Sequence, residues 1–515
     1  MVNNIWKKIE KEIIFNDRFN AIDICLDRWA RLKPEKIAFV FENHKKIEYT
    51  YLGLLREVNK FANLLNLLGI RRNSRIFIFL PKEPYMYISF LGIIKQGSIA
   101  VPLFEAFQKE GLMLRLIKGE ANVIVTNKEL FKRIPSDVKK IVKSLKKIIV
   151  VDSEDFKQKI TKQKEDFKSV LKKKEDTMFM IFTSSTAGTP VAGIQIPHKA
   201  IIHYKFTAEK VLNLDKDTNY WCTAHPGWVT GSAYGILAPL LTGCSSFVLE
   251  GRFDSKKWMD FLKRNKISII YTAPTVLRLL KDEIKKEDLA FVKNIFSVGE
   301  PLTKSIFEFY KKSFGIEIGD TYWQSETGGI VIANYKGLKK KPGSIGKPIP
   351  GIKAKIKNGM IMLKKDWPAL MTGIYKHSTM YKGYFEGKWF KTNDMAFIDK
   401  EGYYFFEGRK DDIIKTSGER VSPIEIESVL LKHPAVKETA VIGIPDSIRG
   451  QIIKAFVVLN REYKANENLS EELKKFVKEN YAGHSYPKEI EFLEELPKTN
   501  SGKIIKSKLR INSRD

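Results

Sequence analysis

"MFMIFTSSTAGTPVAGI", residues 178–194, joins an apolar run to a turn that is rich in hydroxyl side chains. The first five residues are all apolar, which predicts a buried strand. Gly188 and Pro190 then force the chain to turn. Backbone N–H groups and hydroxyls at the end of a strand form a concavity that binds anions, so the turn is a candidate phosphate cradle. Its hydroxyl-bearing residues are Thr183, Ser184, Ser185 and Thr186.

On both sides of this segment, short apolar runs rich in Ile, Val and Phe alternate with amphipathic stretches. Strands that alternate with helices build largely parallel sheets with helices on both faces. The predicted fold class is therefore α/β. Three such strand and helix pairs are 75–80 with 85–97, 121–127 with 128–134, and 267–273 with 274–284.

A change of composition marks a second region. Residues 337–352 are dense in Gly, Pro and Lys, which predicts a connection into a β-rich subdomain that ends near residue 410. Ser422 and Pro423 then predict the N-cap and first turn of a helix. Strand, strand and helix are expected at 437–446, 451–460 and 470–481. We therefore expect a large domain at 1–408 and a small α+β domain at 409–515.

The composition limits the classes of protein to which the chain can belong. Its 515 residues suffice for two or more lobes with their own cores, as in a large enzyme. Three cysteines without CxxC spacing argue against a disulfide framework and favour a reducing compartment such as the cytoplasm. The most apolar stretch, 75–97, is interrupted by Lys82, Glu83 and Pro84, so no membrane-spanning helix is expected.

The net charge is +29, and the excess lies before residue 411, where 71 Lys and Arg accompany 43 Asp and Glu. Such a field attracts polyphosphates, nucleic acids or acidic membranes. Within 138–152 and 160–177, however, lysines alternate with apolar or acidic residues, as on solvated helix faces. No aromatic stacking motif accompanies them, so nucleic acid is not an expected partner.

Five further motifs follow the opening stretch. They are SVGEP (297–301), DTYWQSETGG (320–329), WFKTNDMAF (389–397), EGRKDDIIKTSGERVSPIEIE (407–427) and LPKTNSGKI (496–504). Together with the hydroxyl-rich turn they resemble the AMP-forming adenylating superfamily of acyl-CoA synthetases, luciferases and peptide-synthetase adenylation domains. Residues 220–243, YWCTAHPGWVTGSAYGILAPLLTG, resemble the acetyl-CoA synthetases in particular, in their shorter bacterial form. The resemblance covers about residues 20–510.

The resemblance implies a ligase that activates acetate with ATP and then transfers the acetyl group to CoA. A carboxylate is a poor electrophile, so it is first attached to AMP while catalytic groups neutralise the charge that spreads over the triphosphate. Glu326 is implied to hold Mg²⁺ against phosphate oxygens, and Lys503 to be the adenylation lysine. ATP, Mg²⁺ and CoA are therefore expected, with small molecules as the only partners and the oligomeric state open.

The same resemblance assigns further residues to the nucleotide. Asp394 is implied to accept both ribose hydroxyls. The family pattern has glycine before this aspartate, where this chain has Asn393, a residue that tolerates similar backbone angles. Gly299 leaves room for a flat adenine. The other residues assigned to ATP or AMP are Glu300, Pro301, Asp320, Thr321, Tyr322, Trp323, Gln324, Ser325, Arg409 and Arg420.

The expected substrate preference depends on Trp323. In the family a tryptophan at this place closes the acyl pocket, and smaller residues admit longer chains. Val229, Thr230 and Val298 are the other implied pocket residues. Excluding a longer acid is sterically easy, whereas one methylene fewer changes binding by only ~1–3 kcal/mol. Acetate is therefore the expected substrate, with propionate as a weaker one.

The C-terminal domain is implied to swing about a hinge at Asp411 between the two half-reactions. It presents Lys503 in the first half-reaction and the TSGER face, 416–420, in the second. Lys478 stands in place of a family arginine and lacks its bidentate fork. The residues implied to contact CoA are Thr230, Ser417, Gly418 and Lys478.

Two further places depart from the family pattern. In the turn, which the family writes TSGTTGxPKG, Ser185 replaces a glycine, and residues 191–193 read VAG where KG is expected. A lost charge-assisted phosphate contact is worth ~1.5–3 kcal/mol, so we interpret the turn as a modified cradle. His225 replaces a family acid, and the sequence offers no reason for it.

Alternatives to an acetate:CoA ligase stay open at this point. One is a medium-chain or aromatic acyl-CoA ligase of the same fold. Another is a nucleotide-binding relative whose altered turn has lost turnover. A nucleic-acid binder is suggested only by the charge.

Overall fold

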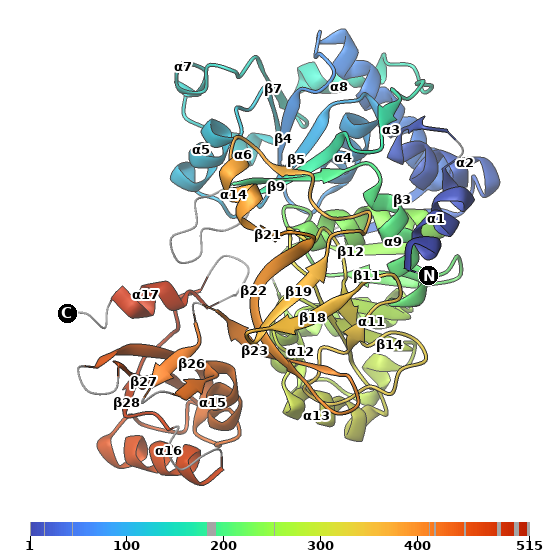
Figure 1. Ribbon diagram of the computed structural model, residues 1–515. Coiled ribbons are helices and arrows are strands. Elements are labelled where there is room, and N and C mark those ends of the chain that lie inside the picture. The colour runs from blue at the N-terminus through green and yellow to red at the C-terminus, as the bar shows by residue number, and fades with distance from the viewer. Residues whose placement is uncertain are drawn as a thin grey trace.

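The computed structural model describes residues 2–14, 16–43, 45–182, 192–251, 253–410, 412–416, 419–446, 450–480, 486–498 and 504–511. Two large, mostly parallel sheets form the N-terminal part, and helices cover both faces of each (Figure 1). The layers therefore run helix, sheet, helix, sheet, helix, which confirms the predicted α/β class.

The first sheet has the strand order β20-β10-β9-β5-β4-β6-β7. Strands β9 to β7 are parallel, whereas β10 and β20 form an antiparallel edge. Ile76 and Ile78 face the central core, whereas Phe77 and Phe79 face an outer core. Both faces are buried, which explains the continuous apolar run. The strands are β4 (Arg75–Phe79), β5 (Ile99–Leu103), β6 (Val123–Thr126), β7 (Lys147–Val150), β9 (Thr177–Phe182), β10 (Gly193–Pro197) and β20 (Gly373–Ile374).

The second sheet has the order β17-β16-β15-β14-β13-β11-β12-β2-β3. Strands β15 to β2 are parallel, and the outer strands on both edges are antiparallel. Tyr271 faces the central core, and Ile270 beside it faces the opposite outer core. The strands are β2 (Ile37–Glu42), β3 (Lys46–Thr50), β11 (Asn219–Cys222), β12 (Ser245–Leu249), β13 (Ile269–Thr272), β14 (Asn294–Ser297), β15 (Gly319–Tyr322), β16 (Ile332–Ala333) and β17 (Lys347–Pro348).

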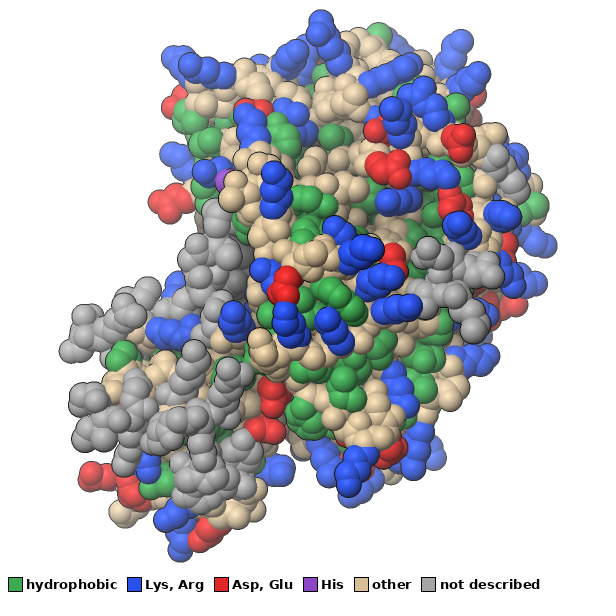
Figure 2. Space-filling view, viewed as in Figure 1, with side chains coloured by type: hydrophobic (Ala, Val, Ile, Leu, Met, Phe, Trp, Pro, Cys, Tyr) green, Lys and Arg blue, Asp and Glu red, His purple; other side chains and the backbone are tan. Residues whose placement is uncertain are grey.

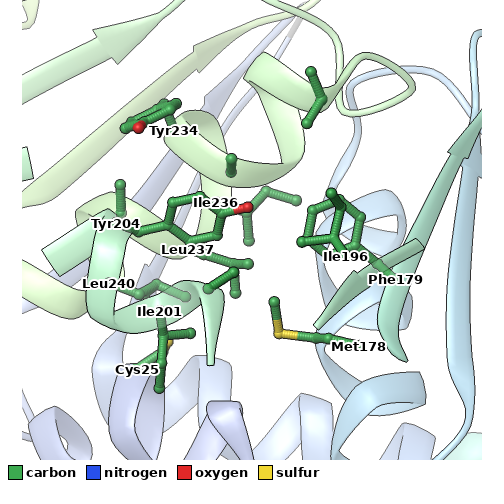
Figure 3. Packing of buried hydrophobic residues seen from close by; sticks show 14 of the residues in the cluster. Cys25, Met178, Phe179, Ile196, Ile201, Tyr204, Tyr234, Ile236, Leu237 and Leu240 are labelled. Carbon is green, nitrogen blue, oxygen red and sulfur yellow. The ribbon is translucent and has the colours of Figure 1, made fainter. Parts of the chain in front are cut away.

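The central core lies between the two sheets and contains a layer of helices. From Met86 to Lys95, every residue of α4 is buried, because a sheet covers the helix on each side. Figure 3 shows Met178 and Phe179 of β9 facing helix side chains such as Leu240. The helices of this layer are α3 (Tyr51–Leu67), α4 (Pro84–Lys95), α9 (Ala200–Lys210) and α10 (Ala238–Thr242), with the π-helical turns Asp23–Asp27 and Gly231–Leu237.

Other helices cover the outer faces of the sheets. On the first sheet these are α5 (Lys109–Lys118), α6 (Lys128–Phe131) and α7 (Val138–Ile141). On the second they are α11 (Ser255–Arg264), α12 (Pro274–Leu280), the 3-10 turn Lys286–Leu289 and α13 (Lys304–Phe314). The remaining elements of this part are α1 (Val2–Ile13), β1 (Arg18–Phe19), α2 (Arg28–Leu32), α8 (Glu154–Thr161) and β8 (Lys172–Lys173).

The β-rich subdomain follows the Gly- and Pro-rich connection, as predicted. Its five strands form an antiparallel sheet. They are β18 (Ala354–Lys357), β19 (Met360–Lys364), β21 (Phe385–Glu386), β22 (Trp389–Ile398) and β23 (Tyr404–Arg409), and α14 (Ser378–Gly383) precedes β21.

The C-terminal lobe mixes helices and strands, which confirms its α+β class, and it has small cores of its own. Ser422 precedes the first helix as predicted, but its hydroxyl does not cap that helix. It donates to the carbonyl oxygen of Glu407 at 2.5 Å and ties the helix to β23. The elements are β24 (Ile414–Thr416), β25 (Glu419–Val421), α15 (Pro423–Leu430), β26 (Val436–Asp446), β27 (Gly450–Leu459), α16 (Glu467–Asn480), β28 (Glu489–Phe492) and α17 (Lys506–Ile511).

The expectation of a solvated helix face at 160–177 is wrong. Helix α8 ends at Thr161, and residues 162–171 form neither helix nor strand. Lys172 is only 7% exposed because its ammonium group donates to the side chain of Asn73 and to the carbonyl oxygen of Gly97. Elsewhere, Lys and Arg side chains are spread over the face of the molecule that Figure 2 shows.

Among the residues that the structure describes, no helix has both the length and the apolar character that a membrane span requires.

A buried ion pair connects α4 to the π-helical turn Asp23–Asp27 within the central helix layer. Lys95, the last residue of α4, is fully buried, and its Nζ lies 2.5 Å from Oδ1 of Asp27. Breaking a buried pair from one side leaves an uncompensated charge in the core. Loss of one partner of this pair should therefore lower the free energy of unfolding more than loss of one partner of a surface pair.

We expect Asp27→Ala to lower the free energy of unfolding by about 3–5 kcal/mol, because Lys95 then stays buried without its partner. The control is Asp155→Ala, which breaks the exposed Asp155–Lys159 pair and should cost only about 0–1 kcal/mol. Urea unfolding of both variants measures the difference. Equal losses would contradict this role for the buried pair.

Candidate active site at the carboxyl edge of the second sheet

Three of the predicted site segments lie where parallel strands of the second sheet end. Strands β11, β13, β14 and β15 run in the same direction, so the residues that follow them lie along one edge. Ligands of open α/β sheets bind at such carboxyl edges. The segments that continue from these strands include 223–230 after β11, 298–301 after β14 and 323–326 after β15.

Trp323 is anchored by a chain of hydrogen bonds across three strands. Its indole Nε1 donates to the hydroxyl of Tyr271 at 3.0 Å. The Tyr271 hydroxyl lies 2.8 Å from Oγ1 of Thr321, which donates to the carbonyl oxygen of Ser297 at 2.7 Å. Trp323 is 9% exposed and shares the central core with Val229 and Val298, each 8% exposed. The structure thus brings three predicted pocket residues into one core.

The partly buried Thr230 precedes the π-helical turn Gly231–Leu237, which contributes Tyr234 to the same place. The ring of Tyr234 packs edge-on against Trp323, with the ring centroids 5.1 Å apart. The sequence motifs assign no role to Tyr234 or Tyr271. Tyr271 could have been noticed as a polar-tipped aromatic near the end of a predicted strand.

Asp394 joins the second sheet to the β-rich subdomain. Its Oδ2 accepts hydrogen bonds from the Tyr322 hydroxyl at 2.7 Å and from Nε2 of Gln324 at 2.6 Å. Its Oδ1 lies 3.1 Å from Nη1 of Arg409, the residue opposite on β23. The four side chains come from three strands and the segment after β15, and all four were predicted to surround the nucleotide.

Two residues of this region have left-handed backbone angles. Asn393 has φ 58°, so the expectation that it takes over a conformation usually left to glycine is confirmed. Gly299 has φ 89°, and a Cβ built on it would meet no atom within 4 Å. The space beside Gly299 is therefore open, as a flat base beside it would require. Glu300, next in the chain, accepts a hydrogen bond from the Thr275 hydroxyl at 2.5 Å.

Glu326 is the last residue of the segment 323–326 that follows β15. Its Oε1 accepts a hydrogen bond from the Tyr384 hydroxyl at 3.0 Å. Burial raises the pKa of Glu326, while the Tyr384 hydroxyl and the nearby Arg409 guanidinium act in the opposite direction. Tyr384 follows α14 and stacks on Phe390. Sequence reasoning missed Tyr384, which lies in a short segment without a recognised motif.

His225 now has a structural explanation. Its Nδ1 accepts from the N–H of Gly227 at 2.9 Å, so its Nε2 donates to the carbonyl oxygen of Leu80 at 3.1 Å. Burial lowers the pKa of His225 to about 3, which keeps the ring neutral. An ionised acid could not donate to Leu80, so the histidine joins the segments after β4 and β11 through a bond that the family's acid could not make. Gly227 also lets the chain pass close to the end of β5, since a Cβ there would lie 2.5 Å from the Phe104 nitrogen.

Lys478 lies on α16 of the C-terminal lobe and not in the segments at the carboxyl edge of the second sheet. It is an exposed residue in the last turn of α16, and its ammonium nitrogen lies 5.6 Å from the ring centroid of Tyr486. Other predicted site residues fall outside the described residues, as does the side chain of Arg420. They are Thr183, Ser184, Ser185, Thr186, Gly188, Asp411, Ser417, Gly418 and Lys503.

Asp320 has contacts within the sheet. It is 3% exposed, and its Oδ1 accepts from the Ser297 hydroxyl at 2.7 Å and from the N–H of Thr321 at 3.0 Å. Burial raises the pKa of Asp320 from 3.8 to about 7. Between these pH values the unfolded chain releases a proton that the folded protein keeps. The free energy of unfolding therefore falls as the pH rises through this window.

We expect Asp320→Asn to remove this pH dependence. Relative to the wild type, the variant should become more stable by about 1.4 kcal/mol for each pH unit between about pH 4 and 7. Urea unfolding of both proteins across this range is the measurement. Asp217→Asn, which changes a 79% exposed side chain, is the control and should follow the wild type. A constant difference between Asp320→Asn and the wild type would contradict the assignment.

Known proteins resemble the chain over nearly its whole length. The model of the AMP-binding enzyme family matches residues 26–365, and that of the AMP-binding enzyme C-terminal domain matches residues 425–503. An acetyl-coenzyme A synthetase of Bacillus subtilis is 39% identical, over 96% of this chain and 90% of the relative. Another, of Rubrobacter xylanophilus, is 32% identical, over 98% of this chain and 86% of the relative.

Among solved structures, an anthranilate CoA ligase in complex with anthranoyl-AMP has a TM-score of 0.89 and 28% identity. The match covers 97% of this chain and 98% of that chain. The resemblance to adenylate-forming acyl-CoA synthetases, first indicated by the motifs, is thereby confirmed. The chain belongs to the AMP-binding enzyme family.

Proposed function

We propose that the protein is an AMP-forming acetate:CoA ligase. In the first half-reaction an acetate oxygen attacks the α-phosphate of ATP, forming acetyl-AMP and releasing pyrophosphate. In the second, the thiol of CoA attacks the acetyl carbonyl, forming acetyl-CoA and releasing AMP. The observation that carries the proposal is the anchored indole of Trp323 beside the Asp394 cluster at one sheet edge. Acetyl-coenzyme A synthetases among its relatives support the choice of acetate.

The Asp394 cluster is suited to hold the nucleotide. Tyr322 and Gln324 donate to one carboxylate oxygen of Asp394 and Arg409 pairs with the other, so the group is oriented before ligand binds. A preorganised carboxylate can accept both hydroxyls of a ribose. The open space beside Gly299 would admit the adenine. We also assign the hydroxyl-rich turn at 183–188 to the phosphates.

Glu326 is the proposed Mg²⁺ ligand. Its carboxylate offers the hard oxygen that Mg²⁺ prefers, and Mg²⁺ is commonly held by one or two carboxylates together with phosphate oxygens. The bound ion would neutralise charge that develops on the triphosphate. Tyr384 donates to Oε1 of Glu326. A carboxylate has about four lone-pair sites and keeps acceptor capacity for an ion beside that bond, so the residues present fit this cofactor.

We propose that 1–408 and 409–515 act as two domains and that the second rotates about Asp411. One position would bring Lys503 to the acetate and the α-phosphate, and the other would bring Ser417 and Gly418 to CoA, with Thr230 and Lys478 as further contacts. The free, buried cysteines Cys25, Cys222 and Cys244 support a reducing compartment, and we propose the cytoplasm.

The acid preference of wild type and Trp323→Gly tests the proposal. Wild type should release pyrophosphate fastest with acetate, whereas the variant should prefer butyrate or longer acids, because each buried CH₂ gains ~0.8 kcal/mol in the vacated space. The measurement is kcat/KM over acetate, propionate, butyrate, hexanoate, octanoate and benzoate, with and without CoA. Trp258→Ala removes a buried tryptophan from an outer core and should leave the preference unchanged. A wild-type preference for benzoate or hexanoate would overturn acetate as substrate.

The two half-reactions can be separated at Lys503. Lys503→Ala should reduce acetyl-AMP formation by several orders of magnitude, because the lysine neutralises charge only in that step. Acetyl-CoA formation from supplied acetyl-AMP should stay within about tenfold of wild type, since it does not require the lysine. The control is Lys508→Ala, which removes an exposed lysine of α17. Equal loss in both half-reactions would contradict the proposed role.

A further inference from the structure

The hydrogen bonds around Tyr271 can run in only one direction. Thr321 donates its hydroxyl proton to the carbonyl oxygen of Ser297, so it can only accept from Tyr271. The Tyr271 hydroxyl therefore gives its proton to Thr321 and accepts from the indole N–H of Trp323. All three side chains are buried, and burial raises the pKa of Tyr271, so the hydroxyl keeps its proton.

A second contact restrains the ring of Trp323 as well. Tyr234 packs edge-on against it and is itself fixed, because its hydroxyl accepts from the Ile330 N–H at 3.0 Å and lies 2.9 Å from Oγ1 of Thr207. Rotation of the indole away from Tyr271 would break a buried hydrogen bond and leave an unpaired N–H in the core. The indole therefore resists displacement by a ligand that presses on it.

We infer that Tyr271 is a positioning residue that sets the acyl-chain length by holding the indole of Trp323 in place. The inference rests on the proposed function, in which Trp323 closes the acyl pocket. Excluding a longer acid requires a wall that does not yield, and the size of a side chain alone does not supply that rigidity. The Tyr271 hydroxyl supplies it, through a single bond that reaches Trp323 from β13.

Tyr271→Phe tests the inference with little change in volume. The variant removes the acceptor of the indole N–H, so longer acids should displace the ring more easily. We expect the ratio of kcat/KM for acetate to that for butyrate to fall about three- to tenfold, the range that one net hydrogen bond supplies. The matched control is Tyr310→Phe, which removes an equally buried hydroxyl, bonded to the Leu277 carbonyl oxygen at 3.0 Å in an outer core.

The Trp323→Phe variant distinguishes a positioning role of Tyr271 from a general loosening of the core around it. In Trp323→Phe no indole N–H remains, so adding Tyr271→Phe should leave the acetate to butyrate ratio of that variant unchanged. An unchanged ratio in Tyr271→Phe alone, an equal fall in Tyr310→Phe, or a further fall in the Trp323→Phe background would each overturn the inference.

The wild-type measurement tests the proposed function separately. A wild type that prefers a longer acid would overturn acetate as substrate. In that case the inference would hold only if Tyr271→Phe shifts the preference further toward longer acids and Tyr310→Phe does not. A wild type that activates no carboxylate would overturn both.

Discussion

Burial of helix α4 and its neighbours between two sheets is the constraint on which the rest of the structure depends. A helix covered on both sides must be apolar around its circumference, and α4 is buried from Met86 to Lys95. The strands that enclose it are apolar on both faces for the same reason, because outer helices cover them as well. The charge of Lys95 is tolerated in this layer because Asp27 neutralises it within the core.

The same arrangement creates the candidate site. Parallel strands that cross the core all end at one edge, and the chain must leave the sheet there through loops. Short loops after β14 and β15 bring their polar residues together, while the β-rich subdomain contributes Asp394 and Arg409 from the other side. The site is therefore built where the second sheet meets the sheet of the β-rich subdomain, and hydrogen bonds from Tyr322 and Gln324 to Asp394 join them.

Low exposure changes the chemistry of the groups at this edge. Burial raises the pKa of Asp320 to about 7, whereas His225 stays neutral well below that pH. Each group has specific partners that match its protonation, as buried polar groups require. The carboxylate of Glu326 lies within the influence of Arg409, so a cationic side chain is already in place where the proposed reaction adds negative charge.

The sequence by itself determined the α/β class, the alternation of strands with helices, the β-rich insert and the family. These follow from local periodicity and from motifs that are each a short, continuous stretch of the sequence. The backbone angle of Asn393 was also predictable, since it depends on one residue type. Only the tertiary structure decided which side chains meet across long separations. The hydroxyl of Tyr384 reaches Glu326, Tyr271 holds Trp323, His225 bonds to Leu80, and Lys172 is buried against Gly97. No periodicity in the sequence encodes these pairs, because each depends on how two sheets and their loops pack in three dimensions.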